Sequence, residues 1–424
     1  MPFLPTPRRA PALPEFIALM AMMSAMVAFS IDAMLPALPA IAAELTPTAP
    51  NRAQLVVGAF LLALGLGTLV IGPLSDRFGR RPVLTGGLAV YLLGAAAAAN
   101  SQSLTGLLAA RILQGLGCAA PRVIAMAIAR DLYAGRKMAR IMSFISIVFA
   151  LVPALAPSVG ALITAAYGWR AIYLAFMLFT LAVGGWFLLR QPETLPPEAR
   201  RPFRPARLWL ALREIFAHAT TRLSIAVMAL ASGMLFATLT SVQPIFDVAY
   251  GQAARFPLYF GAIAIFATSA GFINARLVER LGMRRMVRSI LAVQVGLSAG
   301  MIAVTLWLPM GPLSFGLFVV WTFSLFFQAG MTMGNLNALA LEAMGHIAGL
   351  ASSVVSAVAT IGALLVAVPL GLAFDGTPRP LAMGVLGMAA LGFWLTGRIK
   401  RPVSAGPDPA ASAPRPRFEQ GRGQ

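Results

Sequence analysis

Charged residues are scarce in this 424-residue chain, which contains 11% Asp, Glu, Lys and Arg but 59% hydrophobic residues. A soluble globular chain contains about 25% charged residues. With so few polar side chains, the protein could not cover its apolar surface in water. We therefore expect a lipid bilayer to be its solvent.

Cysteine and histidine are almost absent as well. Cys118 is the only cysteine, which excludes an intrachain disulfide and a cluster of thiolate metal ligands. The two histidines, His218 and His346, are too few for a histidine-rich site, so we expect no bound metal and no cofactor. The sequence also lacks a phosphate loop of the GxxxxGKS or GxxxxGKT type and a set of nucleophile, base and metal ligands. These absences argue against ATP-driven transport and against an enzyme.

Long apolar runs occupy most of the chain, and about 20 apolar residues suffice for a helix to cross a bilayer. Twelve such runs, separated by charged turns, lie at residues 15–38, 53–75, 83–100, 105–129, 139–163, 169–189, 222–247, 256–278, 286–308, 311–340, 346–371 and 379–398. The first run is too long for a cleavable signal, whose apolar part has roughly 7–15 residues. The sequence therefore predicts an all-α membrane protein with twelve transmembrane helices.

The 33 lysines and arginines outnumber the 14 acidic residues, which gives a formal net charge of +19. Such an excess is typical of nucleic-acid-binding proteins, but here its distribution indicates another cause. If the N-terminus lies inside, most basic residues fall in inner loops, as in the clusters at 77–81, 200–213 and 276–288. Basic inner loops are the rule for membrane proteins. We therefore expect both termini in the cytoplasm and no nucleic-acid partner.

Two short segments half a chain apart are similar. GPLSDRFGRR at 72–81 ends the second predicted helix, ARLVERLGMR at 275–284 ends the eighth, and the two align without gaps. Transporters built from two parallel repeats handle their substrate between the halves, near the middle of the membrane. We predict pseudo-symmetric six-helix halves at 1–189 and 222–398, a cytoplasmic linker with an interfacial helix at 190–221, and a disordered cytoplasmic tail at 399–424.

The segment GPLSDRFGRR resembles the signature that follows helix two in the major facilitator superfamily, G-x-L-x-D-R-x-G-R-R. All specified positions match, namely Gly72, Leu74, Asp76, Arg77, Gly79, Arg80 and Arg81. The resemblance implies that these residues hold and release a cytoplasmic gate rather than bind substrate. Glu279 and Arg280 are the corresponding residues of the second half.

Further segments resemble the Bcr/CflA-type branch of drug:proton antiporters. They are IDAMLPALPAIAAEL, RILQGLGCAAPRV, RDLYAGRKMARIMS, LAPSVGAL, QPETLPPEARRP and ALALEAMGHIAGLASS, spread over roughly residues 30–355. The helix-five antiporter motif GPxxGG reads APSVGA here, which keeps Pro157 and Gly160, and Pro153 precedes it by one turn. Prolines at this spacing tend to kink a helix. The resemblance implies a monomeric exporter of small amphipathic or drug-like molecules in the bacterial inner membrane, driven by the proton gradient.

Asp32, in the stretch FSIDAMLPALP, is a carboxylate within the first apolar run. Such a charge costs about 2.5–3.5 kcal/mol on membrane-insertion scales and usually faces a cavity or a partner. Arg111 lies at a similar depth in the fourth run and is the candidate partner, and Gln114 and Arg122 share its helical face. We predict that Asp32 and Arg111 couple proton movement to transport. A purely structural ion pair, or an Asp32 solvated at the outer loop, is the alternative.

A substrate cavity is harder to define from the sequence. Apolar walls with few polar groups are usual for small-molecule sites, and the candidates are Phe29, Met34, Gln114, Arg122, Gln243, Phe246, Gln328, Asn335 and Asn337. Packing between helices is the competing role for each. Arg111 and Arg122 would also suit an anionic substrate, so proton-coupled transport of one polar metabolite (a sugar, nucleoside, amino acid or organic anion) is a second hypothesis. A signalling scaffold is a third, although a scaffold needs no charges within the membrane.

Overall fold

The computed structural model describes residues 11–200, 202 and 205–399, and all regular secondary structure in this part of the chain is helical. The predicted disordered tail, 399–424, lies outside the described residues except for Ile399. The chain up to the predicted linker contains α1 (Leu13–Asp32), η1 (Leu35–Ala37), α2 (Leu38–Leu45), η2 (Pro50–Gln54), α3 (Leu55–Phe78), α4 (Arg80–Ala99), α5 (Leu104–Leu132), α6 (Gly135–Tyr167) and α7 (Arg170–Arg190).

A second set of helices follows. It contains η3 (Pro197–Ala199), α8 (Pro205–Ala217), α9 (Ala219–Pro244), the π-helical turn η4 (Ile245–Ala249), η5 (Ala253–Arg255), α10 (Phe256–Ala267), α11 (Ser269–Leu281), α12 (Met283–Trp307), α13 (Pro312–Leu341), η6 (Gly345–Ile347), α14 (Ala348–Leu372) and α15 (Arg379–Arg398). Below, α1–α7 are called the first group and α9–α15 the second group.

Each of the twelve predicted spans falls on one of these helices or on consecutive helices. By length and hydropathy, eleven segments of the described chain can cross a membrane. The other predicted span, 139–163, lies within α6, a continuous helix of 33 residues. The all-α, multi-pass fold expected from the sequence is confirmed.

Two interruptions of the helices fall at positions that the sequence singled out. The first span breaks after Asp32, where α1 ends, because Pro36 and Pro39 lack the N–H that a continuous α-helix needs. The turn between α3 and α4 is made by Gly79, whose φ of 99° is readily adopted only by glycine. The proline and glycine residues of the local sequence therefore determine where Asp32 and the 72–81 motif lie relative to the helix ends.

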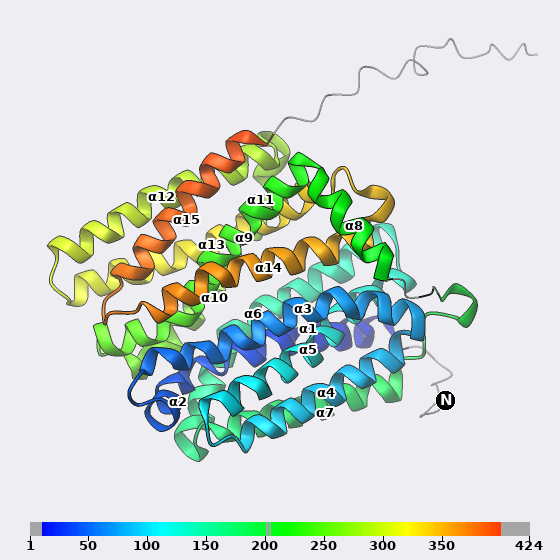
Figure 1. Cartoon of the computed structure of the whole chain (residues 1–424), viewed down its shortest axis with the longest axis horizontal. Helices are drawn as coiled ribbons and strands as arrows, with labels where there is room; N and C mark the ends of the chain where they lie inside the picture. The colour runs from blue at the N-terminus through cyan, green and yellow to red at the C-terminus, as the bar shows by residue number, and fades with distance from the viewer. Residues whose placement is uncertain (1–10, 201, 203–204, 400–424) are drawn as a thin grey trace, which may run out of the picture.

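The two groups lie side by side as two layers, with α1–α7 in one and α9–α15 in the other (Figure 1). They meet along the whole of α3 and α14, where Gly58, Gly65 and Gly72 of α3 face side chains of α14. They also meet where α6 contacts α10, where η2 contacts α14 and where η1 contacts α9. Most helices otherwise pack within their own group.

The bundle has two different ends. We call the end that holds α8 and the α3–α4 turn the linker end, and the end that holds the connection from α1 to α3 the opposite end (Figure 1). Apart from α3 and α14, the contacts between the groups use η1, η2 and α10, near the opposite end. At the linker end α11 is exposed around most of its surface, and Ala270 is its one buried residue. The groups are therefore closed against each other at the opposite end and separated beside α11.

The predicted linker, 190–221, contains a helix, α8, as expected. It contacts α9 and α14, Ala211 and Ile215 are buried among its described side chains, and Glu214 Oε1 lies 2.9 Å from His346 Nε2. Trp209 and Phe216, two turns apart on one face of α8, are 68% and 44% exposed, whereas Ile215 is buried. The apolar side chains are divided between the bundle and its surroundings, and the interfacial position of α8 stays a prediction.

Candidate functional site

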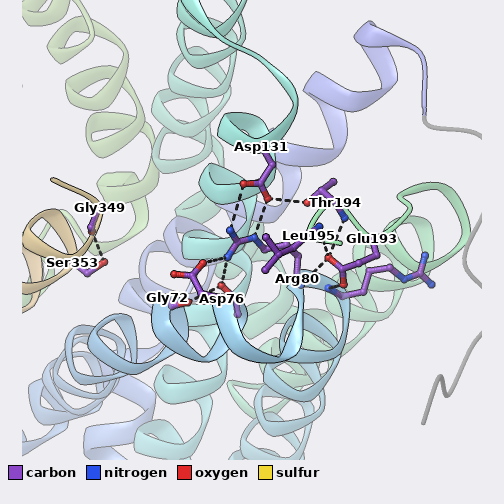
Figure 2. A network of polar contacts seen from close by, with 11 residues as sticks. Gly72, Asp76, Arg80, Asp131, Glu193, Thr194, Leu195, Gly349 and Ser353 are labelled. Carbon is purple, nitrogen blue, oxygen red and sulfur yellow. Dashed lines mark hydrogen bonds and ion pairs between the residues drawn. The ribbon is translucent and has the colours of Figure 1, made fainter. Parts of the chain in front are cut away.

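The largest polar cluster among the described residues surrounds the α3–α4 turn at the linker end (Figure 2). Arg80 begins α4, and its Nη1 donates hydrogen bonds to Asp76 Oδ1 and Ser75 Oγ, both at 2.6 Å. Its Nε donates to Asp131 Oδ2 near the end of α5, at 3.0 Å. Hydrogen bonds between charged groups are stronger than neutral ones, so this single guanidinium joins α3, α4 and α5.

The segment that follows α7 completes the cluster. Glu193 accepts hydrogen bonds from the backbone N–H groups of Arg80 and Arg81, at 2.9 and 3.0 Å, so its carboxylate caps the N-terminus of α4. The Thr194 hydroxyl donates to Asp131 Oδ2 at 2.9 Å, and Figure 2 shows both contacts beside Arg80. Asp131 and Glu193 were not predicted from the sequence, although both lie in segments that carry the family resemblance.

The other residues of the motif have separate positions. Arg81 donates to two backbone carbonyls at the end of α7, at 2.6 and 3.1 Å, which ties α4 to that helix. Arg77 is exposed. Gly72 faces Ser353 of α14, so it is the position of the motif that meets the second group.

The corresponding segment of the second group is built differently. Glu279 and Arg280 are exposed on α11, and neither forms an ion pair with a described residue. Gly282 makes the turn into α12 with a φ of 78°, and Arg284 donates to the carbonyl of Ile399. The repeat therefore shares its glycine turn with the first group but not the polar cluster.

A second cluster lies inside the first group, between α1, α3 and α5. Arg111 of α5 is fully buried, and its Nη1 donates to Gln114 Oε1 at 2.6 Å. Its Nη2 donates to the carbonyl of Ser30 at 3.1 Å, and its Nε to the carbonyl of Val56 at 3.2 Å. The guanidinium also lies over the Phe60 ring, 4.3 Å from its centroid. Arg111 therefore holds three helices together without a described carboxylate in contact with it.

Asp32 is the last residue of α1 and is 4% exposed. We expected an ion pair between Asp32 and Arg111, and among the described residues no such pair forms in this conformation. The donors of Arg111 instead bind Gln114 and the two backbone carbonyls. The expected pairing is wrong for this conformation, and the roles of both residues in proton coupling stay a prediction.

Arg122 lies on the same face of α5 as Arg111, about three helical turns further along. Arg111, Gln114 and Cys118 are buried on that face, whereas Arg122 is exposed. Because Arg122 is exposed on a face of α5 that is otherwise buried, the space between the two groups is open to solvent at the depth of Arg122. This agrees with the separation of the groups beside α11 at the linker end.

The structure places Phe29 and Met34, two predicted cavity residues, against α7. The Phe29 ring lies 5.2 Å from that of Phe176 and 5.4 Å from that of Phe179. Met34 is fully buried, and its Sδ accepts a hydrogen bond from the Tyr173 hydroxyl at 3.9 Å. Both side chains are engaged in packing here, and their contact with a substrate stays a prediction.

The predicted cavity residues of the second group lie on α9, η4 and α13. Gln243, Phe246 and Gln328 are buried, and Asn337 is half-buried. Asn335 Nδ2 donates to Asn274 Oδ1 at 2.7 Å and so links α13 to α11. Among the predicted cavity residues, Gln114 and Arg122 lie on the same face of α5 as Arg111, and the others lie outside α5.

The helix-five motif lies between Asp32 and the second group. Pro153 and Pro157 are both inside α6, which continues through them as one helix. Gly160 packs on the backbone of Ala33, because a Cβ at this glycine would lie 2.9 Å from the Ala33 Cα. The neighbouring part of α6 contacts α10. The motif therefore connects the surroundings of Asp32 with the second group.

Two groups of membrane-spanning helices packed side by side are an architecture of secondary transporters. The family model of the Major Facilitator Superfamily matches residues 19–367, and the chain belongs to this superfamily. The family expected from the 72–81 motif is confirmed. The protein is a multi-pass membrane transporter and not an enzyme.

Several relatives have names or solved structures. The chain is 30% identical over 382 residues to the bicyclomycin resistance protein homolog of Haemophilus influenzae, covering 87% of this chain and 92% of that protein. It is 30% identical over 317 residues to multidrug resistance protein D of Escherichia coli, covering 73% and 76%. The crystal structure of a D-xylose–proton symporter matches with a TM-score of 0.73 at 12% identity, covering 92% of this chain and 98% of that one. At that identity the structural match shows the fold alone.

Proposed function

We propose that this chain is an antiporter that exports small amphipathic, drug-like molecules in exchange for protons, by alternating access between its two groups of helices. The two relatives described above are named for resistance to bicyclomycin and to multiple drugs. The proposal places the protein in the bacterial inner membrane as a monomer, with both termini and the linker end in the cytoplasm. The proton gradient is its source of energy.

The observation that carries the proposal is the position of Asp32. It is buried at the break between α1 and η1, and the next residue, Ala33, packs against Gly160 of α6. A carboxylate in this place has lost most of its contact with water, and opening of the opposite end would restore it. Proton binding to Asp32 would then change with conformation, which is the requirement for coupling proton flow to transport.

The cluster around Arg80 supports alternating access. It fixes α3, α4, α5 and the segment after α7 as one unit. Asp76 is bound to Arg80 of its own group rather than to α14, as expected of a molecule whose linker end is open. In the outward-open state, Gly72 and its neighbours would meet α14 more closely and close that end.

Arg122 is the accessible charge on the inward face of α5. Its guanidinium can bind a carbonyl, hydroxyl or acidic group of a substrate that enters from the linker end. The names of the relatives favour a range of drug-like molecules over one polar metabolite. The proton-flux assay described next distinguishes these two substrate classes.

The test uses purified protein in liposomes that contain a pH-sensitive dye and have an imposed pH gradient. Lipophilic cations, neutral drugs and polar metabolites are added in turn to wild type and to Asp32→Asn, which keeps the shape of the side chain. We expect proton flux from several unrelated drugs in the wild type and none in the variant. Asp375→Asn serves as the control, because Asp375 is an exposed acid at the opposite end.

Flux triggered by one polar metabolite alone would reject drug export in favour of the metabolite transporter. Flux that persists in Asp32→Asn would reject the role given to Asp32. A binding measurement with the same drugs separates coupling from recognition, since we expect the variant to bind them still.

A further inference from the structure

A cavity of about 500 Å³ lies at the opposite end of the second group. It is a half-open hollow lined by the end of η4, the start of α10 and the start of α13, and none of its lining residues belongs to the first group. Its volume falls within the roughly 300–1,000 Å³ that is usual for small-molecule sites. It is therefore separate from the polar clusters around Arg80 and Arg111, although the ring of Phe246 packs behind Phe315 at 5.3 Å.

Three aromatic rings form the walls of this cavity. Phe315 of α13 lies 5.2 Å from the ring of Tyr250 and 5.1 Å from the ring of Tyr259, the latter in an edge-to-face arrangement. The Tyr250 hydroxyl donates to the carbonyl of Ser314 at 3.4 Å, which fixes that ring to the start of α13. All three rings are half-buried. They present a preformed apolar surface from three separate elements.

Arg255 is the one charged residue among those that line the cavity. It is exposed, it directly precedes α10, and it forms no ion pair with a described residue. A guanidinium binds phosphate, sulfonate or carboxylate groups through two parallel hydrogen bonds. The cavity therefore combines an anion-binding group at its edge with aromatic walls.

The surroundings of the cavity are apolar and face outward. Leu258 of α10 is 73% exposed and Leu313 of α13 is 65% exposed, within three residues of Arg255 and Phe315 respectively. These leucines place the cavity where the helices leave the hydrocarbon of the bilayer. Tyrosines at this level commonly act as membrane anchors, but here Tyr250 and Tyr259 turn toward a common hollow with an arginine at its edge.

We propose that this cavity binds an anionic amphiphile, whose acidic group contacts the Arg255 guanidinium and whose apolar body lies against the surface formed by Tyr250, Tyr259 and Phe315. Such a ligand comes from one of two sources. It is either an acidic phospholipid of the adjoining leaflet or a soluble aromatic anion from the aqueous side.

The experiment has one arm for each source and uses the full chain in nanodiscs. In the first, phosphatidylglycerol is titrated into phosphatidylcholine discs, and native mass spectrometry counts the lipids retained per protein. In the second, the affinity for 2-naphthyl phosphate is measured by equilibrium dialysis in pure phosphatidylcholine discs. We expect Arg255→Gln to weaken one of these interactions roughly tenfold, the value of a charge-assisted hydrogen-bonded contact. Phe315→Ala should weaken the same interaction, because it removes an apolar contact.

Arg52→Gln is the matched control, because Arg52 is an exposed arginine at the same end but in the first group. If Arg255→Gln loses phosphatidylglycerol but still binds naphthyl phosphate like the wild type, the ligand is the lipid. If it loses only naphthyl phosphate, the ligand is the soluble anion. Equal binding by wild type and Arg255→Gln in both arms overturns the proposal, as does an equal loss in Arg52→Gln. Melting curves without ligand verify folding, and transport of drugs by Arg255→Gln should stay unchanged.

Discussion

Among single residues, Arg111 shows how a charge is kept inside an apolar bundle. Its donors reach two backbone carbonyls and one side-chain amide, and the ring of Phe60 covers the guanidinium. The carbonyls of Ser30 and Val56 belong to α1 and α3, so the arginine fixes their positions against α5. A planar group with five donors can do this, whereas a lysine ammonium is a single point of charge.

The first prediction concerns Arg111→Lys. The variant cannot reach all three acceptors, and buried acceptors without a donor are costly. We expect the free energy of unfolding to fall by about 2 kcal/mol, measured by thermal or denaturant unfolding in mild detergent. Arg130→Lys is the control, since Arg130 is exposed on the same helix. If the two variants unfolded alike, Arg111 would contribute charge alone and not geometry.

The residue scale is also where the sequence was least informative. Asp32 and Arg111 could be singled out because charged residues are rare in apolar runs. Their pairing could not be derived, because it depends on how α1 is rotated against α5, which hydropathy does not contain. Glu193 was missed for a similar reason: its contact with Arg80 joins positions far apart in the chain, and only the family-like segment QPET was a signal.

Among the elements, the segment after α7 is tied to the start of α4 by one carboxylate. Glu193 accepts from four backbone N–H groups, those of Arg80, Arg81, Thr194 and Leu195, at distances between 2.9 and 3.0 Å. Replacing its charge while keeping its size, as in Glu193→Gln, should cost about 1 kcal/mol as the loss of a helix cap.

The second prediction is that Glu193→Gln loosens the linker. We expect trypsin to cleave between residues 194 and 207 several-fold faster than in the wild type, because fewer bonds hold the segment to α4. Glu198→Gln, at an exposed acidic position in η3, should leave the rate unchanged. Equal cleavage of all three proteins would show that the cap does not restrain the linker.

The packing of α4 against α5 gives the third prediction. A Cβ at Gly94 would lie 2.8 Å from Gln114 Cα and 2.9 Å from the carbonyl of Ala110. Backbone atoms cannot move aside easily, so Gly94→Ala should lower stability by about 1–3 kcal/mol, measured as the melting temperature and the yield of monodisperse protein. Gly86→Ala, where a Cβ meets open space, should be neutral or slightly stabilising.

The helices themselves could be predicted closely from sequence. Their positions follow from runs of apolar residues and from the charged turns between them, both of which are local. The turn at Gly79 was predictable from its motif because glycine supplies a φ of 99°. The exposed face of α8 was not, since Trp209 and Ile215 are both apolar and only the bundle decides which of them is buried.

At the scale of the whole molecule, one side chain joins the two groups at the opposite end. Asn51 of η2 donates its two amide hydrogens to the carbonyls of Leu372 and Phe374 at the end of α14, at 3.0 and 2.7 Å. These carbonyls lack partners within their helix because they lie at its C-terminus. Opening of the opposite end requires both hydrogen bonds to break.

The fourth prediction is therefore that Asn51→Ala shifts the molecule toward opening at that end. Two hydrogen bonds of about 1 kcal/mol each correspond to a shift of roughly 30-fold in the equilibrium. Hydrogen–deuterium exchange should accelerate at residues 50–54 and 371–377. Asn100→Ala is the control, because the Asn100 amide bonds within its own helix at the same end. Unchanged exchange in Asn51→Ala would mean that other contacts keep the end closed.

The contact between α3 and α14, which lie side by side in Figure 1, has a consequence for the path of the motion. Gly58, Gly65 and Gly72 recur at every seventh residue, and seven residues fall about 20° short of two full turns of a straight helix. The line of close contact therefore winds slowly around α3. If α3 and α14 remain in contact while the groups exchange conformations, this line acts as the hinge between the groups. Because the line winds around α3, the hinge would cross the helix obliquely. The two ends of the bundle would then open in slightly different directions.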